Sequence, residues 1–164
     1  MLRRLQLSMM MSLSCDVIKA LRGKTLVTAE SCTGGGIGAA LTGVPGSSVV
    51  FKGGVICYCD QVKRDILGVC PQILEEQGAV SAPVAEAMVI GARRLLKADV
   101  AVSVTGLAGP DGDVFGNPVG TVFIGYADGR TVRVEKFGFS GGREAVREQA
   151  IEAALKLILE QANI

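Results

Sequence analysis

Histidine and tryptophan are both absent from this chain of 164 residues. Without histidine there can be no histidine triad, no histidine general base and no histidine metal ligand. Aromatic residues make up only 4% of the sequence, so the core must be aliphatic and surfaces on which nucleic-acid bases stack are scarce. Any general base in this protein must therefore be a lysine, a glutamate or a tyrosine.

An excess of one charge is also missing, because 17 lysines and arginines face 16 aspartates and glutamates, a net charge of +1. Such a chain has no broad basic field with which to hold nucleic acid or an anionic membrane surface. No apolar run reaches about 18 residues, so the sequence predicts no membrane-spanning helix. We expect a small-molecule substrate as the partner, with neither nucleic acid nor a membrane.

The five cysteines do not form the dense, even-numbered framework of a small secreted domain. This usage is typical of a reducing compartment, so we expect a cytoplasmic protein. Cys57 and Cys59 form a lone Cys-x-Cys pair without a second pair or a histidine, which argues against a zinc site.

Length and pattern predict a single α/β domain. Residues 1–12 have a short apolar run broken by polar residues, and we expect a disordered leader there, ahead of a domain at 13–164. Helix-like and strand-like segments then alternate, which is typical of helices on both faces of a sheet. Asp128-Gly129 predicts an antiparallel hairpin, so the sheet is mixed. The expected architecture is a three-layer α/β/α sandwich. The expected helices cover 17–22, 37–41, 60–67, 71–77, 81–95 and 140–160, and the expected strands cover 25–28, 49–58, 99–105, 121–127 and 131–139.

Glycine-bearing loops follow three predicted strands, at 31–36, 105–112 and 140–142. In an open α/β sheet, ligands bind at the carboxyl ends of the strands. The first loop enters a helix N-terminus, whose free N–H groups favour an anion or a developing oxyanion. Small residues would equally allow a strand and a helix to pack closely, so the spacing alone leaves both interpretations open.

Ser31 stands at this strand-to-helix turn and is the candidate nucleophile. Its base would be Lys63, which lies near the start of a predicted helix, where the helix dipole disfavours a charged amine. Tyr58 or Ser48 could relay a proton near the same site. Cys32 is the competing nucleophile, although the sequence shows no activating cation beside it. Each of these residues also has an ordinary structural interpretation.

Arg143 and Arg147 lie four residues apart, within the first two turns of the last predicted helix. Cations at a helix N-terminus oppose the dipole, and a bound phosphate would relieve that cost while accepting forked hydrogen bonds. The alternative is that both arginines pair with nearby carboxylates.

Five motifs occur in one order along the chain. They are Thr-Ala-Glu-Ser-Cys-Thr-Gly-Gly at 28–35, Val-Pro-Gly-Ser-Ser at 44–48, Gly-Ala-Val-Ser at 78–81, Thr-Gly-Leu-Ala-Gly-Pro-Asp-Gly at 105–112 and Pro-Val-Gly at 118–120. In these motifs and their spacing the chain resembles the CinA C-terminal domain family, whose active members are nicotinamide mononucleotide deamidases of the PncC type. The resemblance begins near residue 13 and extends to the C-terminus.

The resemblance implies an α/β/α domain that hydrolyses the carboxamide of nicotinamide mononucleotide to nicotinic acid mononucleotide and ammonia. It implies no metal and no organic cofactor. It also implies a stand-alone form, without the larger molybdopterin-binding-like domain that many relatives carry. Cys57-Tyr58-Cys59-Asp60 and residues 113–117 differ from the family's usual residues, which bears on substrate fit and rate. The implied functional residues are Ser31, Lys63, Tyr58, Thr105, Arg143 and Arg147.

The hypothesis from the sequence is a Ser-Lys amidase in which Ser31, deprotonated through Lys63 with Tyr58 assisting, attacks the amide carbonyl. The rivals are a catalytically silent pyridine-nucleotide-binding regulatory module and an amidase for another small amide, while a homo-oligomer is left open. The expected binding residues are Thr33, Gly34 and Gly35 for the oxyanion, Thr105, Gly106, Gly109, Arg143 and Arg147 for the ribose phosphate, and Ser48, with an open role.

Overall fold

The strand-like segments of the sequence pair into one mixed sheet. The structure, a computed structural model, describes residues 1–163, and within that range five strands follow the order β2-β1-β3-β4-β5. β1 pairs in parallel with β2 and β3, whereas β4 is antiparallel to both β3 and β5. The predicted mixed sheet and its hairpin are therefore confirmed. The strands are β1 (Leu26–Glu30), β2 (Phe51–Ile56), β3 (Val100–Gly106), β4 (Thr121–Ala127) and β5 (Val132–Gly138).

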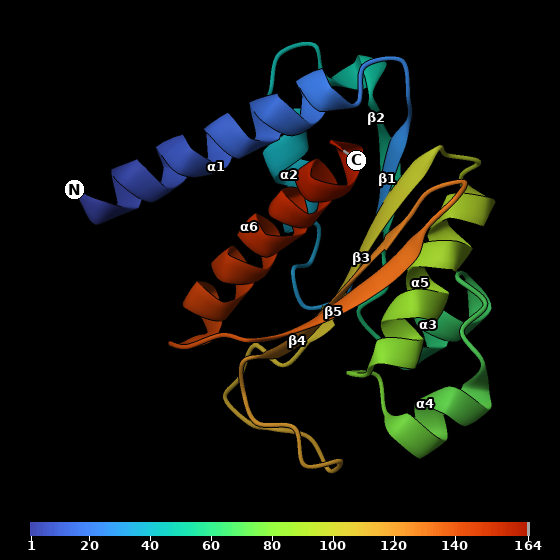
Figure 1. The fold of residues 1–164 in the computed structure, drawn as a ribbon. Helices are drawn as coiled ribbons and strands as arrows, with labels where there is room; N and C mark the ends of the chain where they lie inside the picture. Colours follow the sequence, from blue (N-terminus) through green and yellow to red (C-terminus); the bar gives the residue numbers. More distant parts are fainter. Residues whose placement is uncertain (164) are drawn as a thin grey trace.

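Helices cover both faces of this sheet, as the three-layer prediction requires (Figure 1). One face carries α1, α2 and α6, and the other carries α5, with α3 and α4 beside it. Successive residues of β3 point to opposite faces, so Val100 and Val102 join the core under α6 while Ala101 joins the core under α5. The helices are α1 (Leu2–Ala20), α2 (Gly36–Thr42), α3 (Asp60–Asp65), α4 (Pro71–Gln77), α5 (Ala82–Leu95) and α6 (Arg143–Ala162), with a short 3-10 helix η1 (Ser47–Val49).

The parallel strands all end at one edge of the sheet. β1 leads there into Ser31, β2 leads into Cys57 and Tyr58, and β3 leads into the loop from Leu107. Because parallel pairing aligns carboxyl ends, three loops from distant parts of the sequence meet at this edge.

The first twelve residues differ from the expected disordered leader, because Leu2–Ala20 forms α1. Residues 1–20 contain neither glycine nor proline, and leucine, arginine, glutamine and methionine all favour helix. Arg3 Nη2 donates to Glu144 Oε1 at 2.9 Å and Gln6 Nε2 donates to Glu148 Oε2 at 2.9 Å, which ties α1 to α6.

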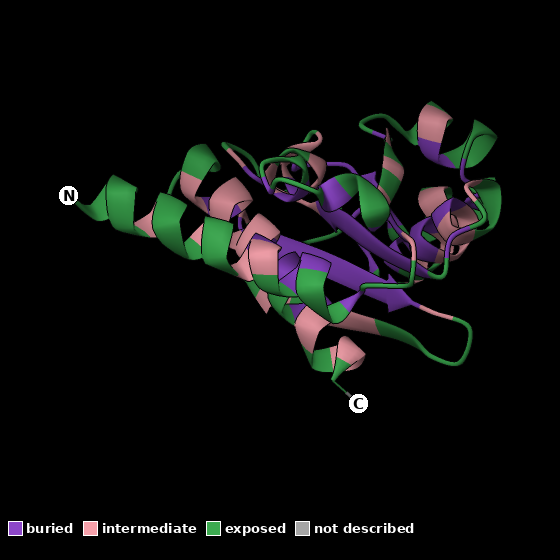
Figure 2. Cartoon of the chain, turned by 90° about the horizontal axis from the view of Figure 1, so that it is seen from above, coloured by how far each residue is buried: buried purple, intermediate pink, exposed green. Residues whose placement is uncertain are grey.

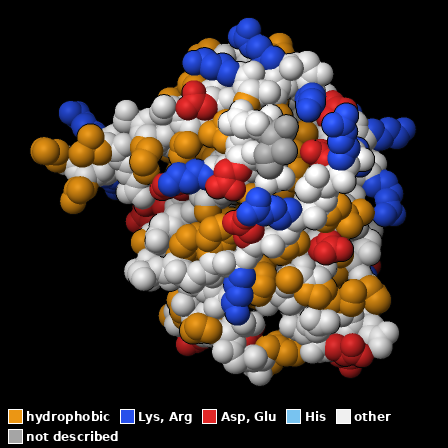
Figure 3. Space-filling model, in the orientation of Figure 1, with side chains coloured by type: hydrophobic (Ala, Val, Ile, Leu, Met, Phe, Trp, Pro, Cys, Tyr) orange, Lys and Arg blue, Asp and Glu red, His pale blue; other side chains and the backbone are white. Residues whose placement is uncertain are grey.

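The amino-terminal half of α1 extends beyond the body of the domain and is largely exposed (Figures 1 and 2). Hydrophobic side chains gather at this protruding end, whereas charges of both signs are interspersed over the body (Figure 3). Within residues 1–163, no helix combines the length and the apolar character that crossing a membrane requires.

We predict that Gly91→Ala lowers the free energy of unfolding by about 1–3 kcal/mol, because a Cβ at this position of α5 would overlap the backbone carbonyl of Leu67. Helix propensity alone predicts the opposite sign, a gain of about 1 kcal/mol. Urea unfolding of the variant measures the difference. Gly138→Ala is the control, since its Cβ would meet nothing within 4 Å. A more stable Gly91→Ala protein would show that α5 does not pack this closely.

Candidate active site

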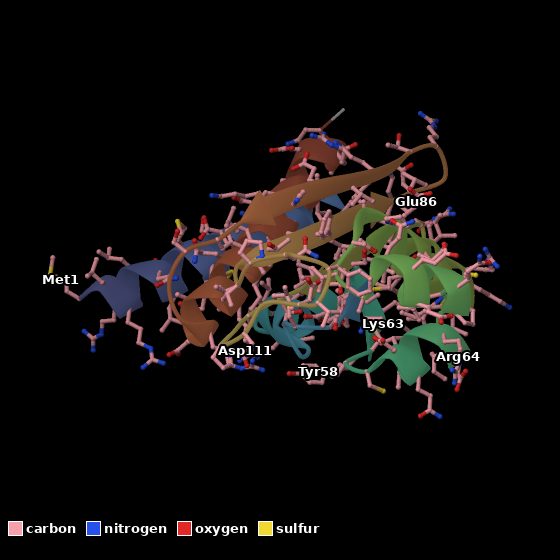
Figure 4. All side chains as sticks on the ribbon, turned by 90° about the horizontal axis from the view of Figure 1, so that it is seen from below. Met1, Tyr58, Lys63, Arg64, Glu86 and Asp111 are labelled. Atoms are coloured by element: carbon pink, nitrogen blue, oxygen red, sulfur yellow. The ribbon has the colours of Figure 1, made fainter. Side chains whose placement is uncertain are left out.

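A cleft of about 300 Å³ opens where β1, β2 and β3 end. Figure 4 looks at the molecule from below, with Tyr58, Lys63 and Asp111 labelled around this region. The loops after all three strands contribute to its wall, as does the first residue of α6. The predicted site residues that line it are Ser31, Tyr58, Lys63, Thr105, Gly106, Gly109 and Arg143.

Ser31 and Lys63 are in direct contact at the floor of the cleft. Lys63 Nζ lies 3.1 Å from Ser31 Oγ, 2.8 Å from the carbonyl oxygen of Cys57 and 3.5 Å from that of Tyr58. The lysine is only 1% exposed and the serine 7%. The N–H of Ser31 donates to the Val104 carbonyl at 2.9 Å, which fixes the serine against β3. The predicted pair of residues is thus brought together.

These contacts suit an amine that exchanges a proton with the serine. A neutral amine has two N–H groups, which the carbonyls of Cys57 and Tyr58 can accept, and one lone pair, which then faces Ser31 Oγ. An ammonium would donate to the same three oxygens. A proton can therefore cross the 3.1 Å contact without any heavy atom moving.

The sequence predicted that the dipole at a helix N-terminus disfavours the charged form of Lys63, and this reason is wrong. α3 is six residues long, and Lys63 lies in its last turn, where a helix dipole favours a cation. Burial beside two carbonyl oxygens, and not the dipole, distinguishes this lysine from a solvated one.

Glu30 is a buried site residue that was not predicted. Its Oε1 accepts from Thr33 Oγ1 at 2.8 Å and from the Ile37 N–H at 2.8 Å. Its Oε2 accepts from Thr28 Oγ1 at 3.1 Å and from the Gly38 N–H at 3.0 Å. The signal in the sequence was an acidic residue directly before the candidate nucleophile, at the end of a strand-like segment that has no other charged residue.

The helix N-terminus after Ser31 is therefore occupied by the protein's own carboxylate, which corrects its predicted role as an anion site. The Gly34 N–H is also engaged, because it donates to the Ser31 carbonyl at 3.1 Å. Thr33 is fully buried, and neither Gly34 nor Gly35 lines the cleft. These three residues shape the turn that presents Ser31, and they do not face a ligand in the cleft.

Arg147 supports the same turn from behind. Its Nε donates to the Cys32 carbonyl at 3.0 Å and its Nη2 donates to the Thr33 carbonyl at 3.1 Å. It does not line the cleft. The prediction that Arg147 holds a phosphate is thus replaced by a structural role, because its guanidinium is directed at backbone carbonyls of the loop that follows Ser31.

Arg143 and Tyr58 connect two walls of the cleft. Arg143 Nη2 donates to Tyr58 Oη at 2.8 Å and Nη1 donates to the Gly109 carbonyl at 2.6 Å. Tyr58 is 60% exposed, and its hydroxyl makes no hydrogen bond to Ser31 or Lys63. The geometry thus does not place the Tyr58 hydroxyl in the predicted proton relay.

Thr105 lines the cleft, but its hydroxyl donates to the Ala79 carbonyl at 2.8 Å and so joins two segments of the wall. Ser48 is exposed in η1, before the start of β2. Because β1 and β2 are parallel, Ser48 lies near the edge where β1 begins, while Ser31 follows the end of β1. Within one chain, the suggested relay through Ser48 is therefore wrong.

The competing nucleophile Cys32 is held in its thiol form. Burial raises the pKa of Cys32 to about 11, and burial likewise raises the pKa of Cys57 to about 11. A neutral thiol is a poor nucleophile, so the oxygen of Ser31 is the better candidate. In residues 1–163, no group of three or more cysteine, aspartate or glutamate side chains is arranged to hold a metal ion.

Comparison with known families matches residues 10–162 to the CinA C-terminal domain. A CinA-like protein of Synechococcus sp. (strain CC9311) is 54% identical over 140 residues, which is 83% of this chain and 33% of that protein. A CinA-like protein of Geobacter sp. (strain M21) is 51% identical over 76% of this chain and 30% of its own length. The chain thus spans about a third of the length of the curated relatives it matches.

Solved structures resemble the whole fold. Competence damage-inducible protein A from Klebsiella pneumoniae is 35% identical with a TM-score of 0.92, covering 94% of this chain and 97% of that one. A competence/damage inducible protein from Agrobacterium tumefaciens is 36% identical with a TM-score of 0.90, covering 95% of this chain and 96% of that one.

We predict that Glu30→Gln lowers the free energy of unfolding by about 2–4 kcal/mol. The amide keeps one acceptor oxygen but turns an NH2 group toward two of the four donors that now face the carboxylate. Urea unfolding measures the loss. Glu86→Gln on the exposed side of α5 is the control and should change stability by less than about 0.5 kcal/mol. Equal stability of both variants would contradict the role given to Glu30.

We predict that iodoacetamide at about pH 8 alkylates the exposed Cys59 and Cys70 and leaves Cys32 and Cys57 unmodified. With pKa values near 11, only roughly one buried thiol in a thousand is ionised under these conditions. Peptide mass spectrometry reads out each site, and the urea-unfolded protein, in which every cysteine should react, is the control. Rapid alkylation of Cys32 in the folded protein would restore it as a candidate nucleophile.

Proposed function

The chain belongs to the CinA C-terminal domain family, and we propose that it is a Ser-Lys amidase that hydrolyses the carboxamide of nicotinamide mononucleotide. The products are nicotinic acid mononucleotide and ammonia. The observation that carries this proposal is the 3.1 Å contact between the buried Lys63 Nζ and Ser31 Oγ at the floor of a ligand-sized cleft.

In the first half-reaction, Ser31 Oγ attacks the amide carbonyl carbon while its proton passes to Lys63 Nζ. The carbonyl oxygen becomes an oxyanion, and the N–H of Cys32, the residue directly after the nucleophile on the cleft wall, is the donor assigned to it. The carbon–nitrogen bond then breaks, and Lys63 returns the proton to the leaving nitrogen. Ammonia departs and an acyl ester on Ser31 remains.

In the second half-reaction, water attacks the ester carbonyl and gives a proton to Lys63. The carbon–oxygen bond to Ser31 breaks, and Lys63 reprotonates the serine. The carboxylic acid product gives up its remaining proton to the released ammonia or to the solvent and leaves as a carboxylate, and the enzyme returns to its starting state. Water is the one co-reactant of the hydrolysis, and it enters in this second half-reaction.

The ribose phosphate is assigned to the wall formed by Arg143 and the loop from Gly106 to Gly109. A guanidinium has five N–H donors, and Arg143 uses one toward Tyr58 Oη and one toward the Gly109 carbonyl. The remaining donors are available to a phosphate at the cleft mouth. In this proposal Tyr58 holds Arg143 in place.

We predict that Ser31→Ala and Lys63→Met each reduce ammonia release from nicotinamide mononucleotide by about 1,000-fold or more. Ser31→Ala should keep substrate affinity within a few-fold, because the cleft walls are unchanged. A coupled ammonia assay and calorimetric titration give the two readouts. Lys52→Met is the matched control, since Lys52 is exposed on β2 and donates to the Lys97 carbonyl.

Three outcomes separate the proposal from its rivals. Substantial turnover by Ser31→Ala would reject the nucleophile. Binding of nicotinamide mononucleotide by the unaltered protein without ammonia release would favour the silent regulatory module. Ammonia release from other small amides alone would indicate a different substrate.

A further inference from the structure

The lining of the cleft carries charges of both signs at different places. Asp60 and Asp111 bring carboxylates, while Lys63 and Arg143 bring cations. Lys63 is buried at the floor beside Ser31, and the Asp60 side chain is 63% exposed toward solvent. Asp60 Oδ1 is 3.9 Å from Lys63 Nζ, so this carboxylate stands close to the reacting atoms.

Among the described residues, Asp60 has one ion pair, the 3.9 Å contact with Lys63, and no N–H or O–H group donates a hydrogen bond to its carboxylate. Its contact with Lys63 is longer than a hydrogen bond, and the amine already has closer oxygens in Cys57 and Ser31. Asp128 shows the contrast, because backbone N–H groups of Arg130 and Thr131 donate to its carboxylate. The Asp60 carboxylate lines the cleft and can therefore interact with a charged group of a ligand there.

Attack by Ser31 fixes where an amide substrate must lie. The contacts of Lys63 with Asp60 and with Ser31 put Asp60 Oδ1 within about 7 Å of Ser31 Oγ. An amide carbon in contact with Ser31 Oγ therefore places the ring that bears the amide within range of this carboxylate. In a pyridinium 3-carboxamide, the positive ring nitrogen is two bonds from the carbon that carries the amide.

We infer that Asp60 makes the cleft select amides whose ring carries a positive charge over neutral rings of the same shape. This inference rests on the proposed amidase function and names the residue that would set its substrate class. A cationic ring offsets the charge of Asp60 close to the floor, while an anionic tail meets Arg143, which also lines the cleft. A neutral ring leaves Asp60 without that partner.

The test compares two substrates that differ in one ring atom. One is nicotinamide mononucleotide, and the other is the C-nucleoside 5′-phosphate in which a carbon replaces the ring nitrogen. For the protein and its Asp60→Asn variant, kcat/KM is measured with each substrate. Asp60→Asn should lower the ratio of the two values about tenfold, because a charge pair at such a distance in a half-exposed site has about that effect.

The ratio separates recognition of the ring from effects on the base. If Asp60→Asn acted only through its neighbour Lys63, it would change kcat/KM equally for both substrates and leave their ratio unchanged. That result would overturn the inference. Asp65→Asn removes a carboxylate from the same helix that does not line the cleft, and it should not change the ratio. A tenfold loss in Asp111→Asn with none in Asp60→Asn would also overturn the assignment to Asp60.

Affinity supplies a second readout that does not depend on turnover. In a Ser31→Ala background, adding Asp60→Asn should weaken binding of the cationic ligand about tenfold and leave that of the neutral ligand unchanged. If neither substrate releases ammonia from the unaltered protein, the proposed function fails, while the two affinities still decide the role of Asp60. Asp60→Ser is the second substitution if Asp60→Asn does not fold.

Discussion

The buried contact between Lys63 and Ser31 is the interaction on which the site depends. Transfer of an ammonium group from water into a protein interior costs on the order of several kcal/mol unless oxygens replace its water shell. Here the carbonyls of Cys57 and Tyr58 provide those oxygens, and both belong to the segment that directly follows β2. The position of β2 beside β1 therefore determines whether the lysine reaches the serine.

Two further charges hold the serine side of this contact, and neither lines the cleft. Glu30 gathers four donors beneath the turn, and Arg147 holds two of its carbonyls from α6. Each charge satisfies backbone groups that a glycine-rich turn would otherwise leave unpaired in the interior. The glycines make the turn possible, and the buried Glu30 and the half-buried Arg147 hold it through their hydrogen bonds. The near-neutral net charge of the chain therefore does not indicate how charges act locally. Glu30 and Arg147 have opposite charges, and both hold the same loop.

The sequence predicted the architecture and the central pair, but it assigned several polar side chains to the wrong partners. Alternating segments and their resemblance to a family placed Ser31 and Lys63 at one edge of the sheet, because parallel strands align their carboxyl ends. Arg147 and Thr105 could not be placed in the same way, because a hydrogen bond to a backbone carbonyl of a distant segment leaves no pattern in the sequence. Ser48 was misplaced because the chain turns before β2, at the end of the strand opposite to the cleft. The helix over residues 2–12 was missed because its contacts with Glu144 and Glu148 are separated from it by more than a hundred residues.

The division of the two arginines on α6 shows how one helix contributes both to the scaffold and to the lining of the cleft. Arg143 is the first residue of the helix and reaches over the cleft mouth to Tyr58 and Gly109. Arg147, one turn later, donates to the carbonyls of Cys32 and Thr33 in the loop that follows Ser31. A shift of α6 would therefore move the mouth and the floor of the cleft together. Because α6 also packs against the sheet and α1, the packing of that layer helps to fix the positions of Arg143 at the cleft and of Arg147 behind Ser31.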